Sequence, residues 1–495
     1  MLFSTQASPP PPRMTHWDTI GQTLTLSGVA LTQWRQTSWL GRWIGALSAW
    51  RQSSWLLHWG ETLLALLAAT VFGLAPFAET DLLGLLLLAA GAFWVLLTVT
   101  DRPVAAAEAG DQPGLFTPIH LLVLLYGAIA TVAVAFSPVQ AAAFVGWTKL
   151  ILYLVFFCVL ARVTRLERGR AIIITVYLLA ALATSVYGLR QWIFGADALA
   201  TWVDPESPLS KTTRVYSYLG NPNLLAGYLE ASVPLSVAAI LAWKSWIQKI
   251  LGVVLLGLNG TCLVLTFSRG GWIGLVVELA VLGILLLYWW SVRFTPFWRR
   301  WAMPALLGGG TTLMVLAVAA LEPLRDRVFS IFAGRGDSSN NFRINVWQAV
   351  LQMIQDRPWL GIGPGNVAFN RVYPRYQKPK FSALSAYSVV LEVLVETGVI
   401  GFTCFVWLLG MTAYQGGRAL NRLRQLQASQ GYWLLAALST MAGMLAHGLV
   451  DTVWYRPQVS TLFWLMLALV AGFYQPPTIA SAATPDRPNL ASEES

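Results

Sequence analysis

The sequence predicts an all-α polytopic membrane protein with about twelve transmembrane helices. Of its 495 residues, 56% are apolar or aromatic and only 11% are charged, whereas about a quarter of the residues are charged in an average soluble domain. The mean hydropathy is +0.58. Apolar runs long enough to cross about 30 Å of hydrocarbon recur along the chain, without the period-2 alternation of a membrane barrel. A soluble enzyme of a few domains is therefore excluded.

The apolar runs define the expected spans and the segments between them. The spans lie near 60–79, 82–100, 119–136, 145–161, 171–193, 222–242, 250–267, 271–290, 302–321, 392–414, 432–453 and 459–474. The first run starts only near residue 60, so no cleavable signal peptide is expected. This gives a cytoplasmic or interfacial segment (1–58), spans one to nine (59–321), a large loop domain between spans nine and ten (322–391), spans ten to twelve (392–474) and a disordered cytoplasmic tail (475–495).

Lysine and arginine are distributed unevenly over the short loops. With a cytoplasmic N-terminus, the cytoplasmic loops carry most of them: Arg102, Arg162, Arg165, Arg168, Arg170, Lys244, Lys249, Arg293, Arg299, Arg300, Arg418, Arg422 and Arg424. The opposite loops carry Lys211, Arg214, Arg269 and Arg456. The positive-inside rule then places both termini in the cytoplasm and the large loop outside. Much of the net charge of +10 reflects this topology, so membrane lipids are expected around the chain and nucleic acid is not expected as a partner.

The terminal segments and the cysteines indicate no chemistry. Trp39, Trp43, Leu47 and Trp50 fall on one helical face, with Arg42 and Arg51 nearby, which predicts an interfacial helix. The three cysteines lie in apolar runs without metal-ligand spacing, so neither a disulfide framework nor a metal site is expected. The segment Gly361–Gly365 has the glycines of a phosphate loop but lacks the Lys-Ser/Thr that should follow, which favours a plain turn. No cofactor is expected.

The loop from 322 to 391 is unusually basic for an outward-facing segment. It carries nine lysines and arginines against four acidic residues. It is too rich in aromatic and aliphatic residues to be disordered, and Asn341 to Ile354 has the apolar spacing of a helix. Membrane insertion does not explain a positive outer loop, because the usual bias is the reverse. The simplest physical interpretation is an anion site.

Two span starts at the outer face are suited to hold that anion. Asn221 and Pro222 begin the sixth span with a capping residue and a first-turn proline, Asn223 follows, and Arg214 lies just upstream. Arg269 occupies the tight turn before the eighth span, where Gly270 and Gly271 would let a ligand approach the backbone. Arg343, on the predicted loop helix, could fold over the same place. Guanidinium groups beside helix N-termini would bind a pyrophosphate or carboxylate, although arginines at span ends also serve as headgroup anchors.

Ionisable residues also occur inside the spans. His447 and Asp451 are one turn apart near the outer end of the eleventh span, with Arg456 after them. They are either functional or a structural Asp–Arg pair that holds helix ends together. The other intramembrane charges are Glu230, Glu278, Lys149, Glu392 and Glu396, and they do not line up along the sequence as a proton or ion relay.

Several motifs resemble a known superfamily. The segments 266–274 (TFSRGGWIG), 356–365 (DRPWLGIGPG) and 391–401 (LEVLVETGVIG), together with Arg343, look like the O-antigen ligase and polymerase superfamily. Within it, the segments 216–225 (YSYLGNPNLL), 337–347 (DSSNNFRINVW) and 447–457 (HGLVDTVWYRP) resemble the cyanobacterial inorganic carbon transporter B family, which is associated with bicarbonate transport.

The resemblance implies a fold, a location and a reaction. The architecture would be GT-C-like, in the inner (plasma) membrane, with the large loop periplasmic between spans nine and ten. The activity would be metal-independent transfer of a glycan from a polyprenyl-diphosphate carrier to a sugar hydroxyl. Arg269 and Arg343 match the arginines that hold the donor diphosphate. The superfamily expects a histidine nine residues before Glu396, where this chain has Tyr387. A phenol is a much poorer base than an imidazole at neutral pH, which leaves His447 as a candidate.

Three functions remain open on the sequence alone. The first is a glycan transferase that binds its donor through Arg214, Asn221, Asn223, Arg269, Arg343, Tyr387, His447 and Asp451. The second is uptake of bicarbonate through the same cations, although no paired broken helices, which transporters often show, are apparent. The third is a scaffold without catalysis. Whether the chain is an enzyme depends on the base that Tyr387 does not supply.

Overall fold

A computed structural model describes residues 21–26, 43–101, 116–196, 214–320, 322, 325–326, 328–329 and 334–475 of the chain. All regular structure in these residues is helical. The predicted tail from 476 onward lies outside the described residues, as do Trp39 and Arg42 of the predicted interfacial helix. The sequence prediction of an all-α chain holds for the described part.

Nine helices in this part are long and apolar enough to cross a membrane. They are α6 (Thr80–Val99), α7 (Pro118–Ala135), α8 (Gln140–Val163), α9 (Glu167–Phe194), α10 with α11 (Pro222–Ala242), α12 (Trp246–Leu265), α13 (Arg269–Trp290 with the short η5), α14 (Pro296–Ala320) and α18 (Val389–Gln425). Three further expected spans coincide with α5 (Gly60–Leu74), α19 (Gly431–Gly448) and α20 (Pro457–Gly472). These helices support a polytopic membrane protein, and the count of twelve spans stays a prediction.

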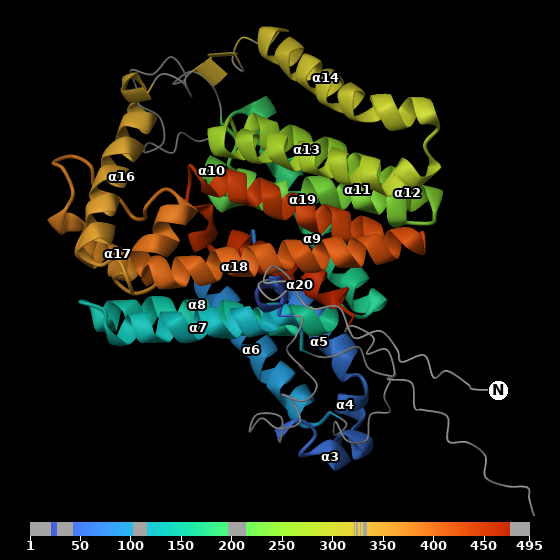
Figure 1. Cartoon of the computed structure of the whole chain (residues 1–495), viewed down its shortest axis with the longest axis horizontal. Helices are drawn as coiled ribbons and strands as arrows, with labels where there is room; N and C mark the ends of the chain where they lie inside the picture. Colours follow the sequence, from blue (N-terminus) through green and yellow to red (C-terminus); the bar gives the residue numbers. More distant parts are fainter. Residues whose placement is uncertain are drawn as a thin grey trace, which may run out of the picture.

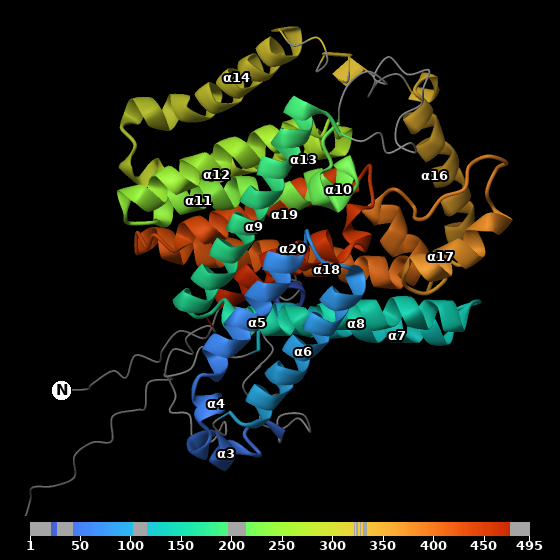
Figure 2. The same cartoon turned by 180° about the vertical axis from the view of Figure 1, so that it is seen from behind.

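The helices from α7 to α20 form a bundle with one distinctive end. In Figure 1, α10, α13, α18 and α19 run side by side, and α16 (Ser338–Asp356) and α17 (Asn366–Val372) stand across their ends at the left. Figure 2 shows α5, α6 and α9 crossing the opposite face of the bundle. The helix α13 packs along α19, and α20 packs along α8. We refer to the end that carries α16 and α17 as the loop end of the bundle. The helix predicted over 341–354 is present as α16.

The N-terminal tryptophans do not share a continuous helix. Trp43 and Leu47 lie in turns before the short helix α3 (Ser48–Ser53), and only Trp50 lies within α3. All three side chains are about half exposed, as contact with a lipid surface would require. Arg51, however, pairs with Glu61 and Asp101, which also pair with Arg162. This arginine therefore ties the segment to the bundle.

Two of the spans are broken, which the hydropathy pattern did not reveal. The sixth divides at Ala231 into α10 (Pro222–Glu230) and α11 (Ser232–Ala242). Pro234 has no N–H to donate to the carbonyl of Glu230 four residues earlier, so an unbroken helix would leave that carbonyl without its partner. The tenth expected span, α18, departs from helical geometry at Gly398, with φ 66° and ψ −171°.

The break in α18 is the place where the loop region attaches to the bundle. The carbonyls of Val395 and Glu396 accept hydrogen bonds from the backbone N–H groups of Ile362 and Gly363, both at 2.9 Å. The donors belong to the glycine-rich segment 361–365, which forms the predicted turn. Its last N–H, on Gly365, donates to the Glu396 carboxylate at 2.6 Å. The turn therefore binds the bundle through its own backbone.

We expect Gly398→Ala to lower the thermal stability of the chain. A Cβ at this position would overlap the backbone of Trp359, and a non-glycine residue at this positive φ costs about 1–3 kcal/mol. The matched control is Gly410→Ala in the same helix, where a Cβ meets no described atom within 4 Å and alanine favours the helix. Thermal unfolding in lipid nanodiscs measures both variants. Equal Tm values for the two would contradict this account of the break.

Candidate functional site

Two helix N-termini meet at the loop end of the bundle. The first helix, α10, begins after Asn221, whose side-chain oxygen accepts the N–H groups of Asn223 at 2.8 Å and Leu224 at 3.3 Å. The second, α13, begins at Arg269, and the Ser268 hydroxyl accepts the N–H of Gly271 at 3.2 Å. Figure 1 shows both starts on the side where α16 stands. The predicted asparagine cap is confirmed, and the partial positive charge of both helix starts faces this region.

Arg269 and Arg343 line one cleft of about 220 Å³. Arg269 belongs to α13 and Arg343 to α16, and Trp347 and Val450 complete the walls with other residues of the two helices. The two arginines that the sequence predicted to converge therefore do so, although 73 residues lie between them.

Each of these arginines has a carboxylate partner. Arg269 binds Asp337 at 3.0 Å and Arg343 binds Asp451 at 3.3 Å. The same Asp337 oxygen accepts the N–H of Asn340 at 2.8 Å and caps α16. Asp337 was not among the predicted site residues, although an aspartate directly before a helical segment is a recognised capping signal. The expected pairing of Asp451 with Arg456 is wrong, because Asp451 binds Arg343 and Arg456 lies over the ring of Tyr455.

Arg214 joins the cluster from a third segment. Its Nε donates to the carbonyl of Thr266 at 3.0 Å, and its terminal nitrogen donates to the Asn223 side chain at 3.1 Å. Asn223 in turn donates to Asp451 at 2.8 Å. Burial, followed by the nearby charges of Arg269 and Arg343, lowers the pKa of Arg214 to about 10, so it remains a cation at neutral pH. Three guanidinium groups thus face two carboxylates.

His447 lies beneath this cluster. Its Nδ1 is 2.7 Å from the Glu230 carboxylate, and both side chains are fully buried. A Cβ on Gly270 would lie 2.8 Å from Nε2 of the imidazole. The glycine therefore makes room for His447. It also lines the cleft, and its role in admitting a ligand to the backbone stays a prediction. A Cβ on Gly271 would similarly meet the Ala226 side chain.

Two of the carboxylates that looked scattered in the sequence, Glu230 and Glu278, lie near each other, and Glu230 also binds His447. Glu230 and Glu278 are both fully buried, and glycines of α13 and α19 leave space for them. Within the described chain, the second oxygen of Glu230, both oxygens of Glu278 and Nε2 of His447 have no hydrogen-bond partner. Intramembrane ionisable groups of this kind are uncommon and are usually functional. We call Glu230, Glu278 and His447 the buried triad.

Tyr387 is next to the arginine cluster but is unsuited to act as a base. Its ring meets Phe342 of α16 edge to face, with 5.3 Å between the ring centroids. Burial, followed by the charge of Asp451, raises the pKa of Tyr387 to about 12, so the phenol is neutral at physiological pH. Its φ of 50° is unusual for a non-glycine residue. Tyr387 therefore lies beside the arginine cluster, as predicted, but it cannot act as the general base that a histidine at this position would provide.

A double-mutant cycle tests the pair Arg343–Asp451. Because both side chains are mostly buried, removing either charge leaves the other without its partner. We expect the double variant to be destabilised by less than the sum of the effects of Arg343→Met and Asp451→Asn, with a coupling energy of about 0.5–3 kcal/mol. The exposed pair Arg325–Glu322 is the control, and its coupling should be close to zero. Additive effects at Arg343 and Asp451 would show that the pair contributes nothing.

A protein-family model matches the part of the chain that contains this cleft. The family model described as O-antigen ligase matches residues 231–406, from the start of α11 into α18. This range contains Arg269, Arg343 and Tyr387. No curated protein matches the chain. The helices and the family match together support an O-antigen ligase-like membrane protein.

Proposed function

We propose that this chain is a glycan transferase of the O-antigen ligase type. Its donor would be a glycan linked to a polyprenyl diphosphate, and the diphosphate would bind Arg214, Arg269 and Arg343 at the loop end, on the non-cytoplasmic side of the membrane. The observation that carries the proposal is the convergence of these three arginines, from separate segments, beside two helix N-termini. The family match over 231–406 supports the same substrate class.

The charges suit a diphosphate better than a monovalent anion. Guanidinium groups bind phosphate oxygens in a bidentate fashion, and the starts of α10 and α13 add partial positive charge. In the free protein, Asp337 forms an ion pair with Arg269, and Asp451 forms one with Arg343. A diphosphate would replace these carboxylates, and the net charge of the cluster favours the exchange because three cations face two anions.

The transfer step follows from the chemistry of the donor. A hydroxyl oxygen of the acceptor sugar forms a bond to the anomeric carbon, while the bond from that carbon to the diphosphate oxygen breaks. The electron pair leaves with the diphosphate, where the arginines stabilise the added charge. The hydroxyl proton leaves to solvent or to a base. His447 does not contact the cleft, because it is fully buried behind Gly270, so we assign it a positioning role through Glu230.

Arginine variants test the donor site. We expect Arg269→Ala and Arg343→Ala each to weaken binding of a polyprenyl-diphosphate glycan by about 10- to 100-fold, because a hydrogen bond to a charged group contributes about 1.5–3 kcal/mol. Lysine variants should fall between alanine and wild type, since they keep the charge and lose the fork. Binding is measured on the chain in nanodiscs with a labelled donor. Arg325→Ala is the control, and wild-type affinity in both cleft variants would refute the site.

Tyrosine 387 provides a test of the missing base. We expect Tyr387→Phe to keep turnover close to wild type with an unchanged pH profile, because the phenol stays neutral. Tyr387→His introduces an imidazole of pKa about 6.5 and should raise turnover, with the gain appearing as the pH rises through that value. Glycan transfer measured from pH 5 to 9 gives both profiles. A strong loss in Tyr387→Phe alone would mean that the phenol takes part in the reaction.

The buried triad favours a second candidate function, the uptake of a small anion such as bicarbonate. Carboxylates without partners inside a bundle are typical of proton-coupled or ion-coupled transport, and helices broken as α18 is at Gly398 often occur in transporters. Proteoliposomes separate the two candidates: uptake of labelled bicarbonate above that of empty vesicles supports transport, and loss of glycan from the donor supports transfer. If the folded protein shows neither activity, the scaffold hypothesis is the one that is left.

A further inference from the structure

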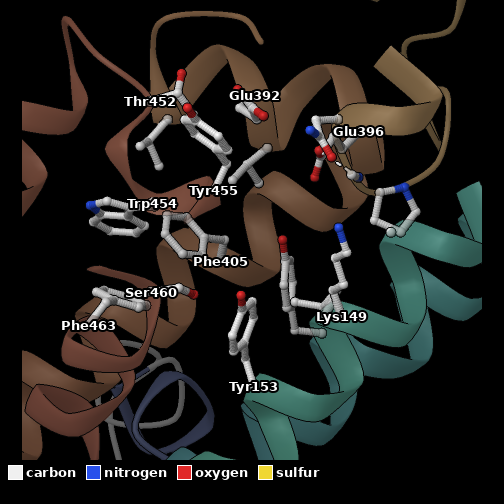
Figure 3. A pocket seen from close by; sticks show the side chains of 18 of the residues that line it. Lys149, Tyr153, Glu392, Glu396, Phe405, Thr452, Trp454, Tyr455, Ser460 and Phe463 are labelled. Carbon is white, nitrogen blue, oxygen red and sulfur yellow. Dashed lines mark hydrogen bonds between the residues drawn. The ribbon is translucent and has the colours of Figure 1, made fainter. Parts of the chain in front are cut away.

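A second cavity lies close to the arginine cluster and has different chemistry. It has a volume of about 160 Å³ and lies between α8, α18, α20 and the segment after Asp451. The short segment 451–455 separates the two: Asp451 binds Arg343 at the cleft, whereas Thr452 and Tyr455 line the second cavity. Figure 3 shows this cavity, which we call the aromatic pocket.

One wall of the aromatic pocket is a preformed aromatic surface. Trp454 stacks on Phe463 with 4.1 Å between the ring centroids, and Phe405 lies 6.3 Å from each of them. These contacts fix the rings before any ligand arrives, because each ring is held by its neighbours. Flat aromatic faces of this kind pack against the C–H face of a pyranose ring.

The opposite wall is polar and includes groups that have no partner. Lys149 lies nine residues into the apolar helix α8, and among the described residues its ammonium has no hydrogen-bond or ion-pair partner. Figure 3 shows its ammonium directed toward the side where Glu396 lies. Glu396 binds the N–H of Gly365 through one oxygen, and its other oxygen bonds to nothing in the described chain. The Lys149 side chain is exposed, and a charged group along a membrane-spanning helix usually faces a polar cavity or has a function.

Two hydroxyl groups extend the polar wall. Ser460 is 7% exposed, and its hydroxyl points into the pocket (Figure 3) without a hydrogen-bond partner in the described chain. The Tyr153 hydroxyl points into the pocket between Ser460 and Lys149. Buried hydroxyl groups in native proteins are nearly always hydrogen-bonded. The hydroxyl of this buried residue faces the cavity and is available to bond a polar ligand there.

We infer that the aromatic pocket binds a sugar residue, with the pyranose face on Trp454 and its hydroxyl groups on Lys149, Glu396 and Ser460. Sugar hydroxyls both donate and accept, so one ligand can bond to the carboxyl group of Glu396 and to the ammonium of Lys149. A cationic headgroup is disfavoured by Lys149. The role of this sugar as the acceptor glycan rests on the proposed function, whereas the binding itself does not.

Saturation-transfer NMR on the chain in nanodiscs tests the inference. The probes are free sugars from three classes: neutral hexoses, N-acetylhexosamines and hexuronic acids. We expect transfer to the ring protons of at least one class, and Lys149→Met to weaken its apparent affinity by about tenfold or more, as the loss of a charged hydrogen bond implies. Ser460→Ala should also weaken binding.

Matched variants control for general damage. Ser439→Ala removes a buried hydroxyl of α19 that lies outside the pocket, and it is the control for Ser460→Ala. Trp433→Leu removes a buried indole outside the pocket, and it is the control for Trp454→Leu. Both controls should bind sugar like the wild type. Transfer to no sugar class by the folded wild type, equal transfer in Lys149→Met and Ser460→Ala, or displacement of the sugar by short-chain phospholipid would each overturn the inference.

The same samples separate this inference from the proposed function. Donor binding at Arg269 is measured in parallel with the labelled polyprenyl-diphosphate glycan. Sugar binding without donor binding would leave the aromatic pocket standing and remove the transferase proposal. Donor binding that survives Lys149→Met, with sugar binding lost, would show that the two sites are distinct and both real.

Discussion

The carboxylate of Asp451 makes the arginine cluster physically possible. It pairs with Arg343 and accepts from Asn223, which in turn accepts from Arg214. Three guanidinium groups near one another in a low-dielectric region repel strongly, and only nearby anions offset that repulsion. Asp337 does the same for Arg269. The free protein therefore holds its cations in place with carboxylates, and an incoming anion exchanges for them without having to assemble the cluster.

The sequence predicted the helices and the positions of the arginines because both have local signals. Apolar length indicates a span, and the Asn221-Pro222 pair and the Ser268-Arg269 turn indicate where helices begin. The partners of the charged groups have no such signal. His447 binds Glu230, which is 217 residues away, and Arg343 binds Asp451, which is 108 residues away. Sequence spacing instead suggested that His447 pairs with Asp451 and Asp451 with Arg456, because only neighbours along the chain are visible before folding.

The two broken spans explain why the functional groups lie where they do. Each interruption follows a carboxylate, the buried Glu230 before Ala231 and the half-buried Glu396 before Gly398. Only the one at Gly398 leaves helical geometry, because Ala231 keeps helical angles, with φ −61° and ψ −24°. Non-helical backbone at membrane depth survives only where protein or a polar cavity satisfies its hydrogen-bonding groups. In α18 the loop turn supplies donors to the freed carbonyls, and the Glu396 side chain reaches the aromatic pocket. Hydropathy could not reveal these breaks, since a span interrupted by one residue has the same mean hydropathy as an intact one.

The segment 451–455 connects the two cavities. Its first residue, Asp451, holds Arg343, while Thr452 and Tyr455 form part of the aromatic pocket. An anion that takes Arg343 away from Asp451 removes one of the contacts that fix this segment, and the hydrogen bond from Asn223 remains. Only a few residues and one 3-10 turn (Val453–Tyr455) lie between Asp451 and the aromatic wall. The arginine cleft and the aromatic pocket therefore share one short backbone segment.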